Sequence, residues 1–552
     1  MSPRSDLANA IADARDRARA AGALSIPPDA ELPEINLERP ANPANGDWAS
    51  NVAMQLAPVA RAAPMQIAQA ILEHFEPPAL VAEATVAAPG FLNFRLDPSA
   101  VAAQVGPILD AGTGYGREPR PQSKRVNVEF VSANPTGPLH VGNARGAFVG
   151  DVLSRVLRAA GHAVTREYYF NDFGGQVRAL GASVRAIRSG SPIPEDGYHG
   201  EYVREMAASV PTEVARAADA TGGDEEADWI LGGWASEVQR ASIEASLVAL
   251  GIEFDVWKTE SSLHDDGWVI RGVERLREAG HVYEADGATW FRSTAFGDDR
   301  DRVIYRSNGQ PTYFAADIGY VLEKFGRGFD ELIYVWGENH HGAVARLKHA
   351  AQAMALDPDA VRILLYSWVR FVRDGEAVSM SKRSGEFVEL DELIGEVGVA
   401  AVRWFFSSRA FTSGIDFDLE LAKRQSNENP VYYVQYAHAR CASILRNGAD
   451  VGIAPDASAA GDLLLHPTEQ ELLRQLLDFP DVVSRAAERR ETHDVPRYCY
   501  ELATALSAFY RDCKVLTEDA ALSAARLALT DATRSVLANG LDLLGISAPE
   551  SM

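Results

Sequence analysis

The stretch ANPTGPLHVGNARGAFVGD, residues 133–151, holds residue types that can bind a nucleotide phosphate. His140 stands just before an expected helix, and a helix N-terminus attracts phosphate. Asn143 is placed to cap that helix through its side-chain oxygen. Three glycines recur every four residues on one helix face, which another backbone or a flat ligand could approach closely: Gly142, Gly146 and Gly150. The stretch predicts a nucleotide site, with an ordinary turn and glycines for helix–sheet packing as the alternative explanation.

A second candidate for phosphate chemistry is the segment VRDGEAVSMSKRSGE, residues 372–386, in which an Asp-Gly turn precedes two positive charges. Lys382 is informative because the chain has only seven lysines among its 53 lysines and arginines. Its ammonium can bring a compact, mobile charge to phosphate oxygens. A solvated loop is the alternative explanation of this segment.

A parallel sheet is needed to bring these two candidates together. Strands are expected at 126–131 and 163–170, with a helix from about 143 to 160 between them, because the apolar residues repeat with the spacing of each element. A second strand–helix–strand unit is expected at 331–337, 343–356 and 361–371. Two such units predict a doubly wound, Rossmann-like α/β domain that binds ligands at the carboxyl edge of its sheet.

The other segments divide the chain into three expected domains. Residues 1–112 are expected to form an N-terminal α+β domain, followed by a linker rich in Gly, Pro and Arg. Residues 113–429 would hold the doubly wound domain, split by an insertion around 180–300 that includes a hairpin near EADGATWFRST. Residues 430–552 carry long amphipathic patterns that predict an all-helical bundle.

Composition narrows the class of protein. Hydrophobic residues make up 47% and charged residues 24% of the chain, no apolar run reaches the roughly 20 residues of a membrane helix, and no signal peptide is evident, so a cytoplasmic protein is expected. The three cysteines form no CxxC pair or Cys/His cluster, so neither a disulfide framework nor a structural zinc site is expected. A net charge of −24 argues by itself against a nucleic-acid partner, although an acidic body can carry a local basic stripe.

Two acidic residues in the expected site bear on the choice of substrate. Glu129 ends the first strand between apolar neighbours, and Asp317 follows GQPTYFAA, where a loop enters a helix. Two carboxylates that face one pocket would select a cationic side chain, and a guanidinium binds carboxylates in planar, bidentate geometry. The alternatives are a salt-bridge role for Glu129 and a helix cap for Asp317.

Together the two candidate segments resemble the signatures of class I aminoacyl-tRNA synthetases. His140-Val-Gly-Asn143 resembles the HIGH signature, and residues 379–383, SMSKR, resemble the KMSKS loop, in the same order and about 240 residues apart. Longer stretches resemble the arginyl-tRNA synthetase family: VEFVSANPTGPLHVGNARG, YYFNDFGGQ, GQPTYFAADIGY, YVWGENHHG, MSKRSGEFVEL and NPVYYVQYAHAR, with GDWASN and PGFLNF resembling its N-terminal tRNA-contacting module. In this chain Asn143 replaces the second histidine of HIGH, and Ser379 replaces the first lysine of KMSKS.

The resemblance implies activation of L-arginine by ATP, accompanied by Mg²⁺, and transfer of arginine to tRNA(Arg) by a monomer that needs bound tRNA for the first step. It implies catalytic roles for His140, Asn143 and Lys382. The sequence itself shows no dedicated set of metal ligands, so no resident metal site is expected. It implies ATP contacts from His140, Gly142, Asn143, Gly146, Met380, Ser381 and Lys382. The implied arginine contacts are Glu129, Asn134, Tyr313, Asp317 and His341, with His340 as the alternative to His341. Since residues 430–552 carry a net charge of −6, tRNA contact is expected from stacking side chains: Tyr432, Tyr436 and Arg440.

Two other functions stay open at this point. One is a nucleotidyltransferase that uses a HIGH-type site without tRNA, which the N-terminal domain and the helical bundle argue against. The other is a non-catalytic tRNA-binding relative, which the replacements Asn143 and Ser379 would permit. At least one tyrosine of the segment YYVQY is expected to pack between helices instead of contacting RNA.

Overall fold

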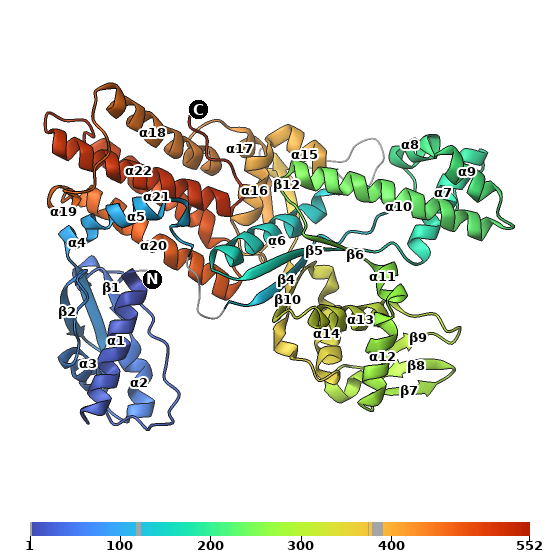
Figure 1. The fold of residues 1–552 in the computed structure, drawn as a ribbon, viewed down its shortest axis with the longest axis horizontal. Helices are drawn as coiled ribbons and strands as arrows, with labels where there is room; N and C mark the ends of the chain where they lie inside the picture. The colour runs from blue at the N-terminus through green and yellow to red at the C-terminus, as the bar shows by residue number, and fades with distance from the viewer. Residues whose placement is uncertain (1–2, 118–122, 374, 378–389) are drawn as a thin grey trace.

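A five-stranded parallel sheet forms the centre of the protein in a computed structural model that describes residues 3–117, 123–373, 375–377 and 390–552 (Figure 1). Its strands, in spatial order, are β11 (Val361–Tyr366), β10 (Glu331–Gly337), β4 (Arg125–Phe130), β5 (Ala163–Phe170) and β6 (Val256–Thr259). All four neighbouring pairs are parallel. The chain runs outward from β4 in both directions, so the predicted doubly wound fold is confirmed, and the switch point lies between β4 and β10.

Helix α6 (Val141–Ala159) crosses from β4 to β5 close to its predicted range, and Gly161, at a φ of 87°, follows its end. A Cβ at Gly150 would stand 2.2 Å from Cγ of Phe130. Glycine at this position therefore lets the helix lie directly against the aromatic side chain of β4.

The predicted strand 361–371 is wrong as a single element. The chain breaks at Ser367 and Trp368 and continues as β12 (Val369–Arg373), which pairs with β13 (Glu376–Ala377) and β14 (Ile415–Asp418) in a second sheet. The guanidinium of Arg145 donates to the carbonyls of Ser367 and Trp368 at 2.9 and 3.2 Å, so a side chain satisfies the backbone groups at the break. An apolar run cannot reveal this break, because the partner lies 222 residues away.

Two lobes separate the units of the sheet. The first lobe contains α7 (Gly175–Ser189), α8 (Glu201–Ser209), α9 (Thr212–Asp219) and α10 (Asp224–Ala249). The chain then returns to the sheet as β6, which lies inside the range predicted as an insertion. The second lobe contains α11 (Glu260–Asp265), α12 (Trp268–Glu278), β7 (Val282–Ala285), β8 (Ala288–Phe291), β9 (Arg302–Tyr305) and α13 (Tyr313–Gly326). The two lobes project apart in Figure 1.

The predicted hairpin is the antiparallel pair β7–β8. Its two turn residues, Asp286 and Gly287, have φ values of 51° and 73°, the left-handed geometry of a two-residue hairpin turn.

The N-terminal region is a separate α+β layer, as expected. Its antiparallel sheet has the order β1 (Trp48–Ser50), β3 (Phe91–Leu96), β2 (Val81–Ala87) and is accompanied by α1 (Pro3–Ala20), α2 (Val52–Ala60) and α3 (Pro64–Glu73). The following helices α4 (Pro98–Ala103) and α5 (Val105–Ala111) lie against the C-terminal bundle in Figure 1.

After α14 (His341–Ala353) and β11–β13, the chain is mainly helical, as expected, with β14 as an intervening strand. Helices α15 (Leu390–Val397), α16 (Val399–Ser407) and α17 (Leu419–Lys423) lead into the bundle. The bundle consists of α18 (Pro430–Asp450), α19 (Ala460–Leu463), α20 (Pro467–Arg489), α21 (Asp494–Asp512) and α22 (Ala520–Leu543).

Buried charges attach this bundle to the central sheet. Arg403, which is fully buried, donates to the carbonyl of Leu544 at 2.6 Å and pairs with Asp151 of α6. Arg490 at the end of α20 pairs with Glu331 of β10 at 2.5 Å. Ion pairs with Arg403 and Arg490 therefore fix the positions of α6 and β10, two elements that border the carboxyl edge of the sheet.

Candidate active site

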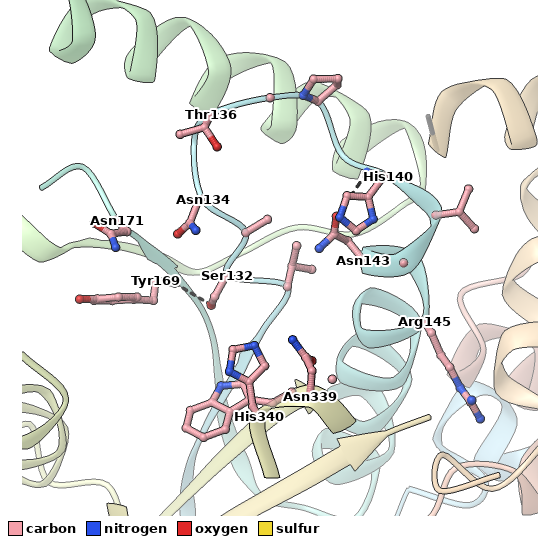
Figure 2. Close-up of a pocket in the computed structure, with 18 of the residues that line it drawn as sticks. Ser132, Asn134, Thr136, His140, Asn143, Arg145, Tyr169, Asn171, Asn339 and His340 are labelled. Atoms are coloured by element: carbon pink, nitrogen blue, oxygen red, sulfur yellow. Dashed lines mark hydrogen bonds between the residues drawn. The ribbon is translucent and has the colours of Figure 1, made fainter. Parts of the chain in front are cut away.

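A cavity of about 2470 Å³ lies at the carboxyl edge of the sheet, where the topology predicts a ligand site (Figure 2). It is lined by the segment after β4, the N-terminus of α6, the ends of β5, β10 and β11, one face of α13, and residues 195–204 of the first lobe. The two halves of the sheet and both lobes thus contribute to one cavity.

The segment after β4 carries backbone strain. Val131 and Ser132 have φ values of 67° and 40°, which side chains rarely adopt. The hydroxyl of Ser132 donates to Oε1 of Glu129 at 3.2 Å. It also accepts from the backbone N–H of Tyr169 at 3.1 Å (Figure 2). These contacts hold the turn open toward the cavity and bind it to β5.

His140 is the N-cap residue of α6, and Asn143 caps the helix from position N3 as the second member of a capping box, not as the N-cap itself. Asn143 stands three residues further on, and its side-chain oxygen accepts from the backbone N–H of His140 at 3.3 Å. Burial lowers the pKa of His140, so its imidazole is neutral at pH 7. Both residues line the cavity beside Gly142, where a Cβ would lie 2.8 Å from the imidazole of His140.

The three glycines of this helix face have three different neighbours. A Cβ at Gly146 would stand 2.6 Å from the ring of Tyr366, and it is Tyr366 that lines the cavity there. Gly150 lies against Phe130, as described above. Gly142 alone of the three therefore lies where a nucleotide could reach it, and packing explains Gly146 and Gly150.

Glu129 lies in the wall of the cavity and is also a salt-bridge partner. Its Oε2 is 2.6 Å from Nζ of Lys324, and the carboxylate is nearly fully buried. Burial raises the pKa of Glu129, while the ammonium of Lys324 acts in the opposite direction. The salt-bridge role that the sequence left open for Glu129 is thus confirmed, and its contact with a substrate stays a prediction.

Asp317 lines the same cavity from α13, four residues after Tyr313, so it is not a helix cap. Within the described part of the chain it makes no hydrogen bond or ion pair. Burial, and then the nearby charges of Glu129 and Glu260, raise the pKa of Asp317 to about 7. A half-buried carboxylate of this kind, without a partner among the described residues, is a candidate binding group for a cation.

Of the remaining predicted arginine contacts, some line the cavity and one does not. Asn134 and Tyr313 both line the cavity, and Tyr313 stands at its mouth with 57% of its surface exposed. His340 also lines the cavity, with its ring 5.8 Å from that of Trp336. His341 opens α14, is exposed, and does not line the cavity.

Sequence reasoning missed three residues of this site. The sequence offered a signal for Lys324, because it is one of only seven lysines and it stands seven residues after Asp317 in the same helical segment. Tyr334 is buried, and its hydroxyl has no hydrogen-bond partner among the residues that the structure describes. Tyr202 reaches from the first lobe and donates to the carbonyl of Thr136 at 2.8 Å. No local pattern marks these two tyrosines. Met380, Ser381 and Lys382 lie outside the described residues.

The described residues hold no group of three or more His, Cys, Asp or Glu side chains that could bind a metal ion. Among the same residues, no helix is long and apolar enough to cross a membrane.

Helix α18 carries the predicted RNA-stacking side chains. The rings of Tyr432 and Tyr436 are parallel within 5° with centroids 6.4 Å apart, and the guanidinium of Arg440 lies 4.7 Å from the centroid of Tyr436. Tyr433 instead shares a hydrogen bond of 2.9 Å with Ser507 of α21, so one tyrosine packs between helices, as expected. A second cavity of about 220 Å³ opens between Tyr436, Arg440 and Ser507.

Three family models match successive parts of the chain. The arginyl tRNA synthetase N terminal domain matches residues 4–96, the class I (R) tRNA synthetase catalytic domain matches residues 104–191 and 234–405, and the DALR anticodon binding domain matches residues 434–552.

Similar proteins cover the whole chain. An arginine–tRNA ligase of Moorella thermoacetica is 46% identical over 99% of this chain and 98% of its own length. One from Kineococcus radiotolerans is 44% identical over the full length of both. The structure of Thermus thermophilus arginyl-tRNA synthetase superposes with a TM-score of 0.80 at 27% identity and covers both chains completely.

Proposed function

The chain belongs to the arginyl-tRNA synthetase family, and we propose that its main cavity is where L-arginine is activated and joined to tRNA. The observation that carries this assignment is Asp317, an unpaired carboxylate in a cavity that also receives the N-terminus of α6. A site for a cationic side chain therefore lies beside a site for phosphate.

The arginine side chain would enter between the two halves of the sheet. Its guanidinium would pair with Asp317, and the hydroxyl of Tyr313, one turn earlier on α13, would contact it from the mouth of the cavity. Asn134 and His340 would bind the polar atoms at the other end of the amino acid. We propose His340 for this contact in place of His341, since only His340 lines the cavity.

ATP would lie across the N-terminus of α6. The neutral imidazole of His140 and the backbone at Gly142 would contact the phosphates, and Asn143 would hold the backbone of His140 in place. Mg²⁺ would accompany ATP and offset the negative charge of its phosphates. The role of Lys382 beside the departing pyrophosphate stays a prediction of the sequence.

The reaction has two steps. A carboxylate oxygen of arginine attacks the α-phosphorus of ATP, and the bond to the bridging oxygen breaks to release pyrophosphate and leave arginyl-adenylate. A hydroxyl of the terminal ribose of tRNA then attacks the carbonyl carbon of the adenylate, and AMP leaves. The protein would act mainly by positioning the reactants and stabilising charge.

The bundle would hold the anticodon end of tRNA. Tyr432, Tyr436 and Arg440 present stacked rings and a cation on one face of α18, which suits unpaired bases. The adjoining cavity of about 220 Å³ would admit one base. We keep the domain limits of 112/113 and 429/430, a monomeric state, a need for tRNA in the activation step and a cytoplasmic location as proposals that follow from this function.

The two alternative functions are not supported, because the chain contains an anticodon-binding domain and its relatives are named arginine–tRNA ligases. The test is to charge bulk tRNA with each of the twenty amino acids in turn, and to follow ATP–pyrophosphate exchange with and without tRNA. We expect charging with arginine alone. Exchange without any charging would favour the nucleotidyltransferase, and neither activity would favour the non-catalytic relative.

A further inference from the structure

One face of α13 carries a polar stripe that descends into the protein below the cavity. Tyr313, Asp317, Tyr320 and Lys324 follow each other at intervals of four, three and four residues, so they share this face. Tyr313 is 57% exposed, whereas Lys324 is completely buried. A pocket proposed to bind a cation therefore has a second cation beneath it.

The ammonium of Lys324 is held on three sides. It lies 2.6 Å from Oε2 of Glu129, and 4.2 and 4.1 Å from the ring centroids of Tyr320 and Tyr334. Burying an ammonium costs free energy that the pairing with Glu129 and the two aromatic faces offset. A methionine or leucine would fill the same space without that cost, so a charge at this position needs a further reason.

The charges around the pocket supply that reason. Glu167 is held by Arg327 through two bonds of 2.7 Å, and it receives a further bond from Asn127 at 2.8 Å. On the α11 side, Glu260 accepts from the hydroxyl of Tyr169 at 2.8 Å.

Two basic groups also face this region. His264 lies 3.8 Å from Glu260, and Arg346 of α14 acts on Asp317 through its charge, without an ion pair. Lys324 compensates Glu129 in the same way that Arg327 compensates Glu167. Of Glu129 and Asp317, it is thus Asp317 that has neither an ion pair nor a hydrogen bond among the described residues. Glu195 and Glu201 also line the cavity without such partners, but they are exposed on the first lobe.

We propose that Lys324 is a specificity-determining residue of the arginine pocket: its ammonium neutralises Glu129 and leaves Asp317 as the carboxylate that meets the positive charge of the substrate. This inference rests on the proposed function. It assigns to Glu129 the role of a paired group in the floor of the pocket, and to Asp317 the selection of a charged over a neutral side chain.

The consequence is a fixed charge count. If Lys324 were removed, the pocket would hold two carboxylates, Glu129 and Asp317, in a partly desolvated environment. Two like charges there resist simultaneous ionisation, so the pair would share protons. Without the charge of Glu129, the free ammonium of Lys324 would oppose an incoming guanidinium. Removal of both charges together would return the pocket to the net charge that it has now.

A double-mutant cycle on the full chain tests this balance. The variants are Lys324→Met, Glu129→Gln and the pair together, and calorimetry measures binding of L-arginine and of L-citrulline, its neutral isostere. We expect each single variant to lose about tenfold or more in arginine affinity and to discriminate less against citrulline. The double variant should recover to within about threefold of wild type, because both members of a buried pair are then replaced. Thermal unfolding controls for folding.

Proton release separates an electrostatic role from simple space filling. At pH 7, arginine should release about half a proton from the wild type and the double variant, and more from Lys324→Met, where Glu129 holds an additional proton. A double variant that binds no better than the weaker single variant, or a Lys324→Met protein that behaves as wild type, overturns the proposal. If neither single variant folds, the arginine affinity of the double variant decides: a value within about threefold of wild type supports the proposal, and a weaker one overturns it. A wild-type chain that neither binds arginine nor charges tRNA would instead contradict the proposed function.

Discussion

Asp317→Asn is the sharpest perturbation of the proposed site, because it removes one charge and changes almost no volume. The pKa of Asp317, at about 7 against an ordinary value of 3.8, means that ionising this carboxyl in the empty pocket costs about 4 kcal/mol. A bound guanidinium would offset that cost. Loss of one partner from such a buried pair costs about 2–5 kcal/mol, which corresponds to an increase in the Kd for arginine of about 30- to 5,000-fold.

The same shift predicts how binding varies with pH. About one tenth of the Asp317 carboxyls would be ionised at pH 6, half at pH 7 and nine tenths at pH 8, since their pKa is about 7. Arginine should therefore bind the wild type about tenfold more tightly at pH 8 than at pH 6. Because the folded pKa is raised, Asp317 favours the folded state below pH 4 and loses this contribution as pH rises through 7. Arginine should consequently raise the melting temperature more at pH 8 than at pH 6.

The assay is calorimetric titration of arginine between pH 6 and 8, in buffers of different ionisation enthalpy and without ATP or tRNA. Asp317→Asn should bind weakly at every pH and lose the tenfold trend. ATP affinity is the internal control, and it should stay within about twofold of wild type. A variant that keeps the wild-type Kd, or one that keeps the wild-type dependence on pH, would show that another group supplies the charge and would refute the assignment.

Three further outcomes follow from the site. His340→Ala should raise the KM for arginine in the charging assay by about tenfold while the adjacent His341→Ala leaves it unchanged, and equal effects would contradict the placement of His340 in the cavity. Gly146→Ala should lower the free energy of unfolding in urea by about 1–3 kcal/mol, since its Cβ would stand 2.6 Å from the ring of Tyr366, and an unchanged midpoint would show that the ring moves freely. Tyr436→Ala should raise the KM for tRNA by about tenfold, the loss of one stacked base, without altering arginine binding; an altered arginine Kd would point to a misfolded bundle.

Local patterns in the sequence predicted the elements around the site well. Residues 163–170 and 331–337 form strands with the predicted limits, and the Asp286–Gly287 turn forms the predicted hairpin. The spacing of Tyr313 and Asp317 placed both on one helical turn at the cavity. These features depend on backbone geometry and on residues close together in the chain, which a periodic pattern records directly.

Other features were decided by residues far apart in the sequence. Glu129 and Lys324 are 195 positions apart, and their pairing determines which carboxylate of the cavity is free. Arg145 ends the strand β11 from 222 residues away, and Tyr366 occupies the space above Gly146. Of the adjacent residues His340 and His341, only the first lines the cavity, because the chain turns there from a short 3₁₀ segment into α14.

The sequence by itself determined which residue types stand at the carboxyl edge of a doubly wound sheet, and hence the family and the kind of chemistry. Only the tertiary structure decided which of those groups are neutralised within the protein and which remain to meet a substrate. The physical reason is that helix and strand periodicity is a local property of the backbone, whereas desolvation and charge pairing depend on all the groups that surround a side chain in space.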